Sequence, residues 1–344
     1  MGLGSGIKRF YKEWMPSIFW AFIAWLFLRT FFFEAFNIPS GSMRSTLLQG
    51  DYIVVNKLAY GPRLPITPLS LPFAHQKFYL DWFHLPYLRI PGYSSVQRND
   101  VVVFNYPMDT EFPIDHREHY IKRCIGLPGD TLLVDSTQVY VNGKRAQDPE
   151  GMQLLYAVNT DTAGIDSNMV RQMGIEWATY MPMKGHYYLY MPPALADSLK
   201  QKKNISSVIL NVHKRGFYDP DIFPHDTTYK WNVDFYGPIV VPKKGDSVKL
   251  TSKNISLYKR IISVYEKNKV AVLGDSVLIN GKRTQYYTFQ MNYYFMMGDN
   301  RHESLDSRFW GFVPEDHIVG RASFILFSSN KEPGRSGRWL KWIR

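Results

Sequence analysis

The chain has little cysteine, no low-complexity sequence and few long apolar runs. Each of these scarcities excludes some classes of protein. Cys124 is the sole cysteine in 344 residues, which excludes an intrachain disulfide and leaves the redox compartment open. The composition is that of a globular protein, with 45% apolar and 21% charged residues. No RNA-binding or zinc-finger signature accompanies the net charge of +11. That charge therefore favours an anionic membrane surface over nucleic acid as a partner.

A single uncharged apolar run, Trp14–Leu28, lies near the N-terminus. As a helix it reaches only about 22 Å, but continuation to Phe33 gives about 30 Å, the thickness of a hydrocarbon core. We therefore predict a transmembrane anchor over residues 14–33. A cleaved signal peptide remains an alternative, although no Ala-x-Ala site follows the run. A buried core helix is a further alternative, although the run is unusually aromatic.

Basic residues precede this run and set its direction. Lys8, Arg9 and Lys12 lie on the N-terminal side. The positive-inside rule then places residues 1–13 in the cytoplasm and everything after Phe33 on the other side of the membrane.

Beyond the anchor the chain has no long amphipathic helix of convincing period. It has short β-branched and aromatic runs that end in turn residues, which predict antiparallel β structure. These runs are Asp51–Tyr60, Asp100–Pro107, Thr131–Lys144 and Ala322–Ser328.

Two similar stretches, Val139–Arg145 (VYVNGKR) and Val277–Arg283 (VLINGKR), each contain Asn-Gly, a strong hairpin signal. A shared hairpin type explains them, and a partial duplication is the alternative. The polar, irregular region between them, residues 151–265, is typical of an inserted subdomain. The loop Pro62–Val96 is rich in proline and aromatic residues, which suits packing or contact with lipid headgroups.

The stretch IPSGSM places Ser40, Gly41 and Ser42 just beyond the anchor. Glycine allows an unusual backbone at such a turn, and free N–H groups there could receive an oxyanion. Ser-Gly-Ser is also common in ordinary loops. A serine nucleophile needs a base, and the chain has neither a GxSxG elbow nor a legible Ser/His/Asp set.

The stretch HYIKRCIGLPGD supplies a candidate base, because Lys122 and Arg123 interrupt an apolar, strand-like run. Adjacent residues of a strand face opposite sides, so one of the two should point inward. Burial lowers the pKa of a lysine, which could then accept a proton from a serine. The alternative is a pair of surface cations.

A third stretch, Met297–Ala322, alternates in charge around Ser304 and Ser307. Such density indicates either a buried network of paired side chains or an exposed loop. The charged residues concerned are Asp299, Arg301, Asp306 and Arg308.

Taken in this order after an N-terminal anchor, IPSGSM, YIKRxxGLPGD and GDNRxxSxDSRxWGFVP resemble the motifs of type I signal peptidases of the bacterial Ser/Lys class. The resemblance covers about Phe31–Tyr60, Asp100–Asp130 and Met297–Ala322, under a third of the chain. It implies a serine endopeptidase that is anchored in the membrane and removes N-terminal signal peptides from exported preproteins.

The resemblance assigns a role to each matching position. Ser42 corresponds to the nucleophile and Lys122 to the general base. The Ser40 hydroxyl joins the Ser42 backbone N–H in the oxyanion hole, and Ser304 orients the lysine. Asp299, Arg301, Asp306 and Arg308 correspond to a structural polar network. The apolar pockets for small residues at positions −1 and −3 are lined by Phe36, Ile38, Met43, Leu47, Tyr120 and Ile121. The resemblance implies no cofactor and no metal.

The resemblance also implies a mainly β fold, with a coiled antiparallel catalytic core, an N-terminal transmembrane helix and an inserted β-rich subdomain. We place the two parts of the core at residues 34–130 and 291–330, with the insert at 131–290 between them. Residues 331–344 form a basic, Trp-bearing tail that is either solvated or bound to an anionic membrane surface. The expected location is the bacterial cytoplasmic (inner) membrane, spanned once, with the catalytic domain on the periplasmic side. The expected partners are preproteins and membrane lipid, and not nucleic acid.

Two departures from the family pattern are notable. Ser45 stands where the family usually has proline, which we expect to loosen the turn after the nucleophile. Asn99 stands where it often has glycine, a change we expect to be harmless. Two other interpretations stay open: a membrane-anchored β scaffold that binds exported chains, and a Ser/Lys protease that cleaves itself.

Overall fold

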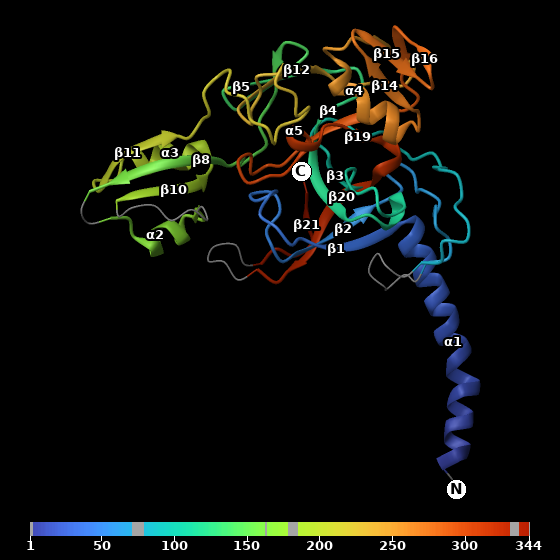
Figure 1. The fold of residues 1–344 in the computed structure, drawn as a ribbon. Coiled ribbons are helices and arrows are strands. Elements are labelled where there is room, and N and C mark those ends of the chain that lie inside the picture. Colours follow the sequence, from blue (N-terminus) through green and yellow to red (C-terminus); the bar gives the residue numbers. More distant parts are fainter. Residues whose placement is uncertain (1–2, 71–78, 162–163, 178–184, 331–336, 344) are drawn as a thin grey trace.

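The structure is a computed structural model that describes residues 3–70, 79–161, 164–177, 185–330 and 337–343. Its first element is α1 (Leu3–Phe31), which projects away from the rest of the protein (Figure 1). The stretch Lys12–Phe31 is long and apolar enough to cross a membrane, and none of it is buried against the protein. A helix that exposes so many aromatic and aliphatic side chains is suited to lipid. The helix ends before Phe33, where the first strand begins.

The body of the molecule is mainly β, as the sequence predicts. Its largest sheet has eight strands, and every neighbouring pair is antiparallel. Register shifts where β20 meets β2 and β3, and where β4 meets β18, add twist and help to curl the sheet. In spatial order the strands are β1 (Phe33–Asn37), β2 (Asp51–Asn56), β20 (Ile318–Ser328), β3 (Val101–Asn105), β4 (His119–Gly126), β18 (Tyr293–Met297) and β19 (Val313–Pro314), with β21 (Lys341–Trp342) also paired to β20.

Both Asn-Gly stretches form the expected hairpins. Asn142 and Asn280 each have φ 52°, and the glycine after each also has a positive φ, which fits the tight turn that this dipeptide favours. The first hairpin belongs to the sheet β12 (Phe235–Val240), β5 (Thr131–Asp135), β6 (Gln138–Val141) and β7 (Lys144–Arg145). The second belongs to the sheet β14 (Val270–Leu273), β15 (Ser276–Ile279) and β16 (Lys282–Arg283).

Residues 131–290, which we predict to be an insert, contain two kinds of structure. The sheet β5–β7 with β12 shares an apolar core with Phe295 of β18 and with Phe312. The remaining elements near that core are β13 (Ser247–Lys249), β17 (Tyr286–Thr288), α4 (Ile255–Arg260) and the π-helical turn Ile261–Tyr265. In contrast, a separate lobe has its own apolar core and lies to one side in Figure 1. It comprises β11 (Ile205–Leu210), β8 (Leu154–Thr160), β10 (His186–Met191) and β9 (Glu176–Trp177), with α2 (Ser167–Gln172) and α3 (Pro193–Lys200).

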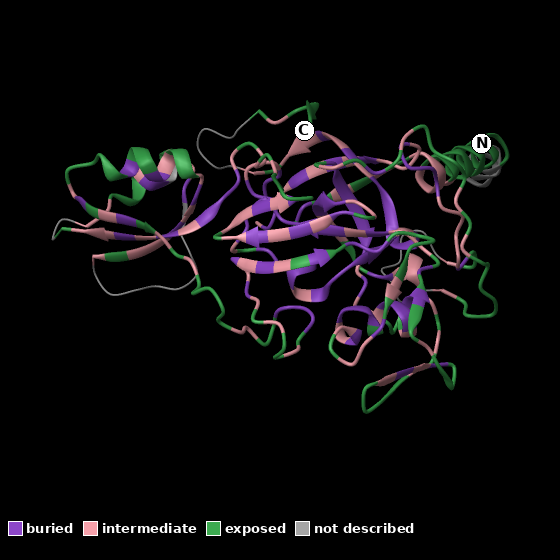
Figure 2. Cartoon of the chain, turned by 90° about the horizontal axis from the view of Figure 1, so that it is seen from above, coloured by how far each residue is buried: buried purple, intermediate pink, exposed green. Residues whose placement is uncertain are grey.

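Burial follows this architecture. Buried residues concentrate in the strands of the main sheet, whereas most residues of α1 from Lys12 to Leu28 are exposed (Figure 2). Strand β3 is buried at every position, which shows that the sheet is covered on both faces where β3 and β4 pair. A polar side chain on either face of that pair must therefore find a partner inside the protein.

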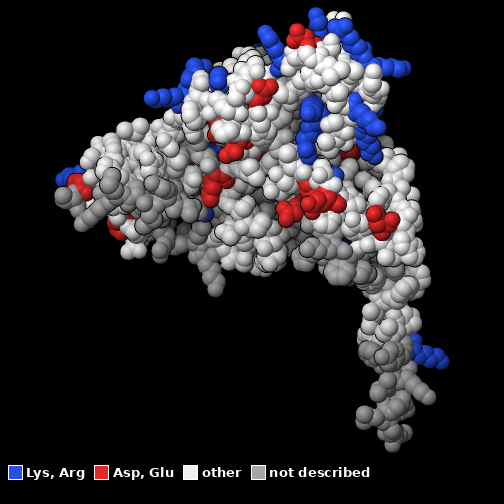
Figure 3. All heavy atoms as spheres, viewed as in Figure 1, with Lys and Arg blue, Asp and Glu red and all other residues white. Residues whose placement is uncertain are grey.

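Much of the positive charge on one face of the molecule lies away from the membrane helix. On the face in Figure 3, Lys and Arg side chains cluster over β14–β16, at the end of the molecule far from α1. This part of the net charge therefore gives no support to the membrane-surface interpretation of the composition.

Candidate active site

The segment between β1 and β2 carries the first motif and is held at both ends. The Ile38 N–H donates to the Asp51 carbonyl, and the Gly50 N–H donates to the Ile38 carbonyl, both at 2.9 Å. Between these bonds the Arg44 N–H donates to the Gly41 carbonyl at 2.8 Å and closes a turn. Ser42 lies in this turn and is 8% exposed.

Lys122, on β4, meets this turn from the middle of the main sheet. Its Nζ donates to Ser42 Oγ at 2.7 Å and to the Ile121 carbonyl at 3.0 Å. The side chain is buried, with 4% of the residue exposed. Burial lowers the pKa of Lys122 to about 8, although the negative charges of Asp306 and Asp299 act in the opposite direction. The geometry therefore joins a serine hydroxyl to an amine that is partly neutral near pH 8.

The sequence predicts that one of the two adjacent cations, Lys122 and Arg123, points inward, and the structure buries both. Both Lys122 and Arg123 are buried, because the sheet is covered on both faces at this point. Alternation still separates them: Lys122 faces Ser42, whereas Arg123 forms a two-point ion pair with Asp299 at 2.7 and 2.8 Å.

Ser40 Oγ lies 3.5 Å from Ser42 Oγ, so the two hydroxyls predicted from the first motif share one site. Ser304 is also buried near this turn. Its Oγ, however, has no hydrogen-bond partner among the described residues, and the orienting contact on Lys122 comes from the Ile121 carbonyl instead.

The four charged residues of the third motif are all nearly or fully buried. Asp306 accepts from the Arg308 side chain at 2.7 and 2.9 Å and from the Gly298 N–H at 3.1 Å. The same carboxylate caps α5 (Ser307–Trp310) by accepting from the Arg308 N–H. These bonds and the Arg308 charge lower the pKa of Asp306 despite its burial, so it stays ionised.

Arg301 is connected to the other charged residues of the motif by hydrogen bonds. Its Nε donates to the Gly298 carbonyl at 3.2 Å, and its own carbonyl accepts from Arg308 at 2.6 Å. The motif thus forms a connected buried network rather than an exposed loop.

Asn300 and Gly298 also contact the Ser42 turn, and the role assignments from sequence did not include them. The Asn300 N–H donates to the Ser42 carbonyl at 3.0 Å, and its side-chain amide donates to the Gly41 carbonyl at 3.4 Å. A Cβ on Gly298 would lie 2.5 Å from the Ser42 carbonyl oxygen, so only glycine fits there. Their signal was present in the sequence, since both belong to the GDN part of the third motif.

A further missed contact links the third motif to the side lobe. The Leu155 N–H donates to His302 Nδ1 at 3.0 Å, so the ring proton of a neutral His302 lies on Nε2. Nε2 donates to Asp234 at 2.7 Å. Gln153 exchanges backbone hydrogen bonds with Asp299 and Arg301. No local pattern could have predicted these bonds, because Asp234 and Leu155 are far from His302 in sequence.

The residues predicted to line the substrate pockets divide between two apolar clusters. Ile38, Met43 and Leu47 are buried in one cluster, and Phe36 and Ile121 pack at its edge. Tyr120 packs on the neighbouring cluster with Trp310 and lies with its ring centroid 5.6 Å from Lys122 Nζ. The half-buried Phe36, Tyr120 and Ile121 are therefore accessible at the edges of these clusters, whereas Ile38, Met43 and Leu47 belong to the core of one.

The two departures from the family pattern have a backbone explanation. Ser45 has φ +91°, a conformation that proline cannot adopt, so serine changes the local backbone and not only the side chain. Asn99 has φ +71°, and asparagine is one of the few residues besides glycine that tolerate this region.

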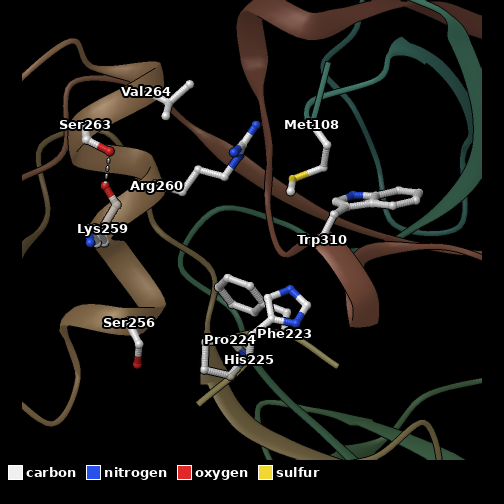
Figure 4. Close-up of a pocket in the computed structure, with 10 residues that line it drawn as sticks. All are labelled: Met108, Phe223, Pro224, His225, Ser256, Lys259, Arg260, Ser263, Val264 and Trp310. Atoms are coloured by element: carbon white, nitrogen blue, oxygen red, sulfur yellow. Dashed lines mark hydrogen bonds between the residues drawn. The ribbon is translucent and has the colours of Figure 1, made fainter. Parts of the chain in front are cut away.

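A cavity of about 300 Å³ lies apart from this site, and its lining includes neither Ser42 nor Lys122. Figure 4 shows α4 and the following turn on one side of it and Trp310 on the other. Its largely apolar walls provide no nucleophile–base pair, so the dyad remains the candidate active site. The lining residues are Met108, Phe223, Pro224, His225, Ser256, Lys259, Arg260, Ser263, Val264 and Trp310.

Known proteins are similar in sequence to the part of the chain that holds this site. The family described as signal peptidase, peptidase S26, matches residues 11–189 and 284–327, a range that includes all three motifs. Signal peptidase I of Buchnera aphidicola subsp. Acyrthosiphon pisum is 28% identical, over 98% of this chain and 81% of its own length. The signal peptidase I of Haemophilus influenzae is 26% identical over 93% of this chain and 71% of its own length. That of Pseudomonas aeruginosa is 27% identical over 94% and 75%.

Proposed function

The chain belongs to the signal peptidase family, peptidase S26, and is a signal peptidase enzyme; we propose that it cleaves preproteins with Ser42 as nucleophile and Lys122 as general base. One observation carries this mechanism: Lys122 Nζ lies 2.7 Å from Ser42 Oγ inside the protein. A serine becomes nucleophilic when an adjacent base can take its proton.

The proposed reaction proceeds through an acyl-enzyme. Neutral Lys122 accepts the Ser42 proton while Oγ attacks the scissile carbonyl carbon. The Ser42 N–H and the Ser40 hydroxyl stabilise the resulting oxyanion. The Lys122 ammonium then gives its proton to the leaving amine, and the signal peptide stays on Ser42 as an ester. Water attacks this ester with Lys122 again as base, which releases the signal peptide and restores the serine.

The buried network sets the conditions for this chemistry. Arg123 and Arg308 neutralise Asp299 and Asp306, so neither carboxylate pairs directly with Lys122. In the proposed mechanism Ser304 would come into contact with Lys122 when substrate excludes water from the site. We propose that the half-buried Phe36, Tyr120 and Ile121 contact small residues at −1 and −3, with Ile38, Met43 and Leu47 forming the floor.

We propose that α1 anchors the enzyme in the bacterial cytoplasmic membrane and places the catalytic body on the periplasmic side. The length of Lys12–Phe31 and the basic residues at its N-terminal end support this orientation. The exposed aromatics Trp82, Tyr93, Trp339 and Trp342 are suited to lipid headgroups, and we propose that they contact them. Enzyme and signal sequence would then share one membrane, which raises their effective concentration.

The test compares Ser42→Ala and Lys122→Ala with the unmodified chain in detergent, using a preprotein and a gel readout. Each variant should lose cleavage while the protein still folds and inserts, because each removes one half of the dyad. Cleavage near the wild-type rate in either variant would refute the role of that residue. A non-enzymatic scaffold predicts no cleavage by the wild type, and self-cleavage predicts a fall in the intact mass of the enzyme alone.

A further inference from the structure

The connection between α1 and the catalytic body is very short. Helix α1 ends at Phe31 and β1 starts at Phe33, so a single residue separates them. That residue, Phe32, is fixed on both sides: its N–H donates to the Leu28 carbonyl at 2.9 Å, and its carbonyl accepts from the Lys57 N–H at 2.8 Å. A flexible linker would leave these backbone groups to water.

Lys57 follows β2 and closes the end of the helix with its side chain. Its Nζ donates to the carbonyl of Arg29 at 3.0 Å and to that of Thr30 at 3.5 Å. The last carbonyls of a helix have no partner within it and carry its partial negative charge, so a cation there is favourable. The ammonium thus joins a strand of the catalytic body directly to the last turn of the membrane helix.

Glu34 makes the second connection, from β1 back to the helix. Its Oε2 lies 2.8 Å from Lys57 Nζ, and its Oε1 accepts from Arg29 at 2.8 and 3.0 Å. The side chains of Glu34 and Lys57 are each only 13% exposed. Charged groups with so little contact to water hold a fixed geometry far better than surface pairs do.

The path from this junction to the nucleophile is equally constrained. Strand β1 pairs with β2 along its whole length, from Phe33 opposite Asn56 to Asn37 opposite Tyr52. The next residue, Ile38, is bonded to Asp51 and Gly50, and the Ser42 turn follows. Any change in the angle between α1 and β1 therefore moves the Ser42 site relative to the membrane.

We propose that Lys57 and Glu34 are positioning residues that lock the catalytic body onto α1, and so fix the height of the Ser42 site for substrates held in the same membrane. This inference rests on the proposed function, because it requires α1 to span the membrane and Ser42 to be the nucleophile. In this proposal, the contacts of Lys57 and Glu34 determine which bond of a preprotein held in the membrane reaches Ser42. A soluble peptide, which diffuses freely into the site, does not depend on it.

The test uses the full chain in vesicles of phosphatidylethanolamine and phosphatidylglycerol with two substrates. One is a preprotein inserted in the same vesicles, with two Ala-x-Ala sites four residues apart. The other is a soluble peptide that contains one of these sites without the apolar segment. For Lys57→Met we expect preprotein cleavage at the wild-type site to fall about tenfold, cleavage at the second site to appear, and peptide cleavage to stay within twofold.

Two further variants sharpen the result. Lys57→Arg keeps a cation with several donors and should restore most of the site selection. Arg98→Met, which breaks the ion pair with Asp130 far from α1, is the matched control and should leave the ratio of the two preprotein products unchanged. Glu34→Gln serves if Lys57→Met does not fold, and should shift the product ratio in the same direction.

Equal loss on both substrates would show that Lys57 only maintains the fold, and no loss on either would show that the junction is irrelevant; both results overturn the proposal. Failure of the wild type to cleave either substrate would instead contradict the proposed function itself.

Discussion

Lys57 and Lys122 are both largely removed from water, yet they lie in opposite chemical surroundings. Lys57 contacts a carboxylate and two helix carbonyls, whereas Lys122 contacts a hydroxyl and one carbonyl. Burial lowers the pKa of both, but Glu34 opposes the shift at Lys57 through a direct ion pair. At Lys122 the nearest carboxylates are already paired with arginine.

The comparison teaches that burial alone does not make a lysine a base. A buried ammonium with a paired carboxylate stays charged and connects two parts of the structure. A buried amine without such a partner gives up its proton more easily and can do chemistry. The two surroundings predict losses of activity of very different size, and opposite changes in stability, when each lysine is replaced by methionine, which has a similar length.

The largest expected effect is the loss of cleavage in Lys122→Met. Removal of the base should lower kcat/KM for a preprotein by about a thousandfold or more. The folded protein should be as stable as the wild type or more stable by roughly 1–3 kcal/mol at pH 7, because a costly buried amine is gone. Cleavage assays and thermal unfolding measure the two quantities, and a clear loss of stability would contradict the proposed environment of Lys122.

The next effect is the dependence of wild-type activity on pH. The pKa of Lys122 is about 8, so the active neutral form decreases tenfold for each pH unit below that value. At pH 6 only about one molecule in a hundred carries the free base, and kcat/KM should fall accordingly. Rates on a soluble peptide between pH 5 and 9, with circular dichroism as the folding control, test this expectation. A flat profile down to pH 5 is incompatible with a neutral lysine base.

Lys57→Met should change stability in the opposite direction to Lys122→Met. It leaves Glu34 with Arg29 alone and two helix carbonyls without their donor, which should cost about 1–3 kcal/mol. The unfolding temperature should therefore fall by several degrees, while Lys57→Arg should recover most of the loss. Equal stability of the methionine variant and the wild type would remove the contrast between the two lysines.

The smallest effect concerns the two hairpins, which share a local sequence as the lysines share a residue type. Asn142 and Asn280 have the same φ, and each side chain accepts from a backbone N–H at the start of the adjoining strand, that of Thr131 in β5 or of Lys269 just before β14. Replacement by alanine strains the turn and should cost about 1 kcal/mol at either position. Denaturant unfolding of both variants measures the difference. A neutral result at both would show that the turn residues do not set this geometry.

Much of the fold was predictable from sequence because it depends on local signals. The Asn-Gly turns, the alternating runs and the charge-free N-terminal segment each specify their own structure, and the structure shows all three. The family resemblance of the motifs also predicted that Ser42 and Lys122 lie in one site. The contact between them is long-range, and spacing alone did not predict it.

The rest depends on partners that are distant in sequence. Lys57 lies in an ordinary strand end, and nothing near it marks a contact with Arg29 or Glu34. Arg123 does lie on the opposite side of the strand from Lys122, but no local pattern predicted that covering of both sheet faces would bury both cations. Contact of the C-terminal tail with solvent or lipid stays a prediction, and its sequence gave no sign that Arg338 pairs with buried Asp51 at 2.7 Å. Residues 331–336 and 344 of that tail lie outside the described residues.

The most direct test of the dyad is the titration of Lys122 itself in the folded enzyme. Lysine labelled with ¹³C at Cε gives one resonance per side chain, and Lys122→Met identifies the resonance that belongs to Lys122. A midpoint near pH 8 is predicted for Lys122. A midpoint near that of an ordinary lysine, about 10.4, would contradict the role of Lys122 as a neutral base.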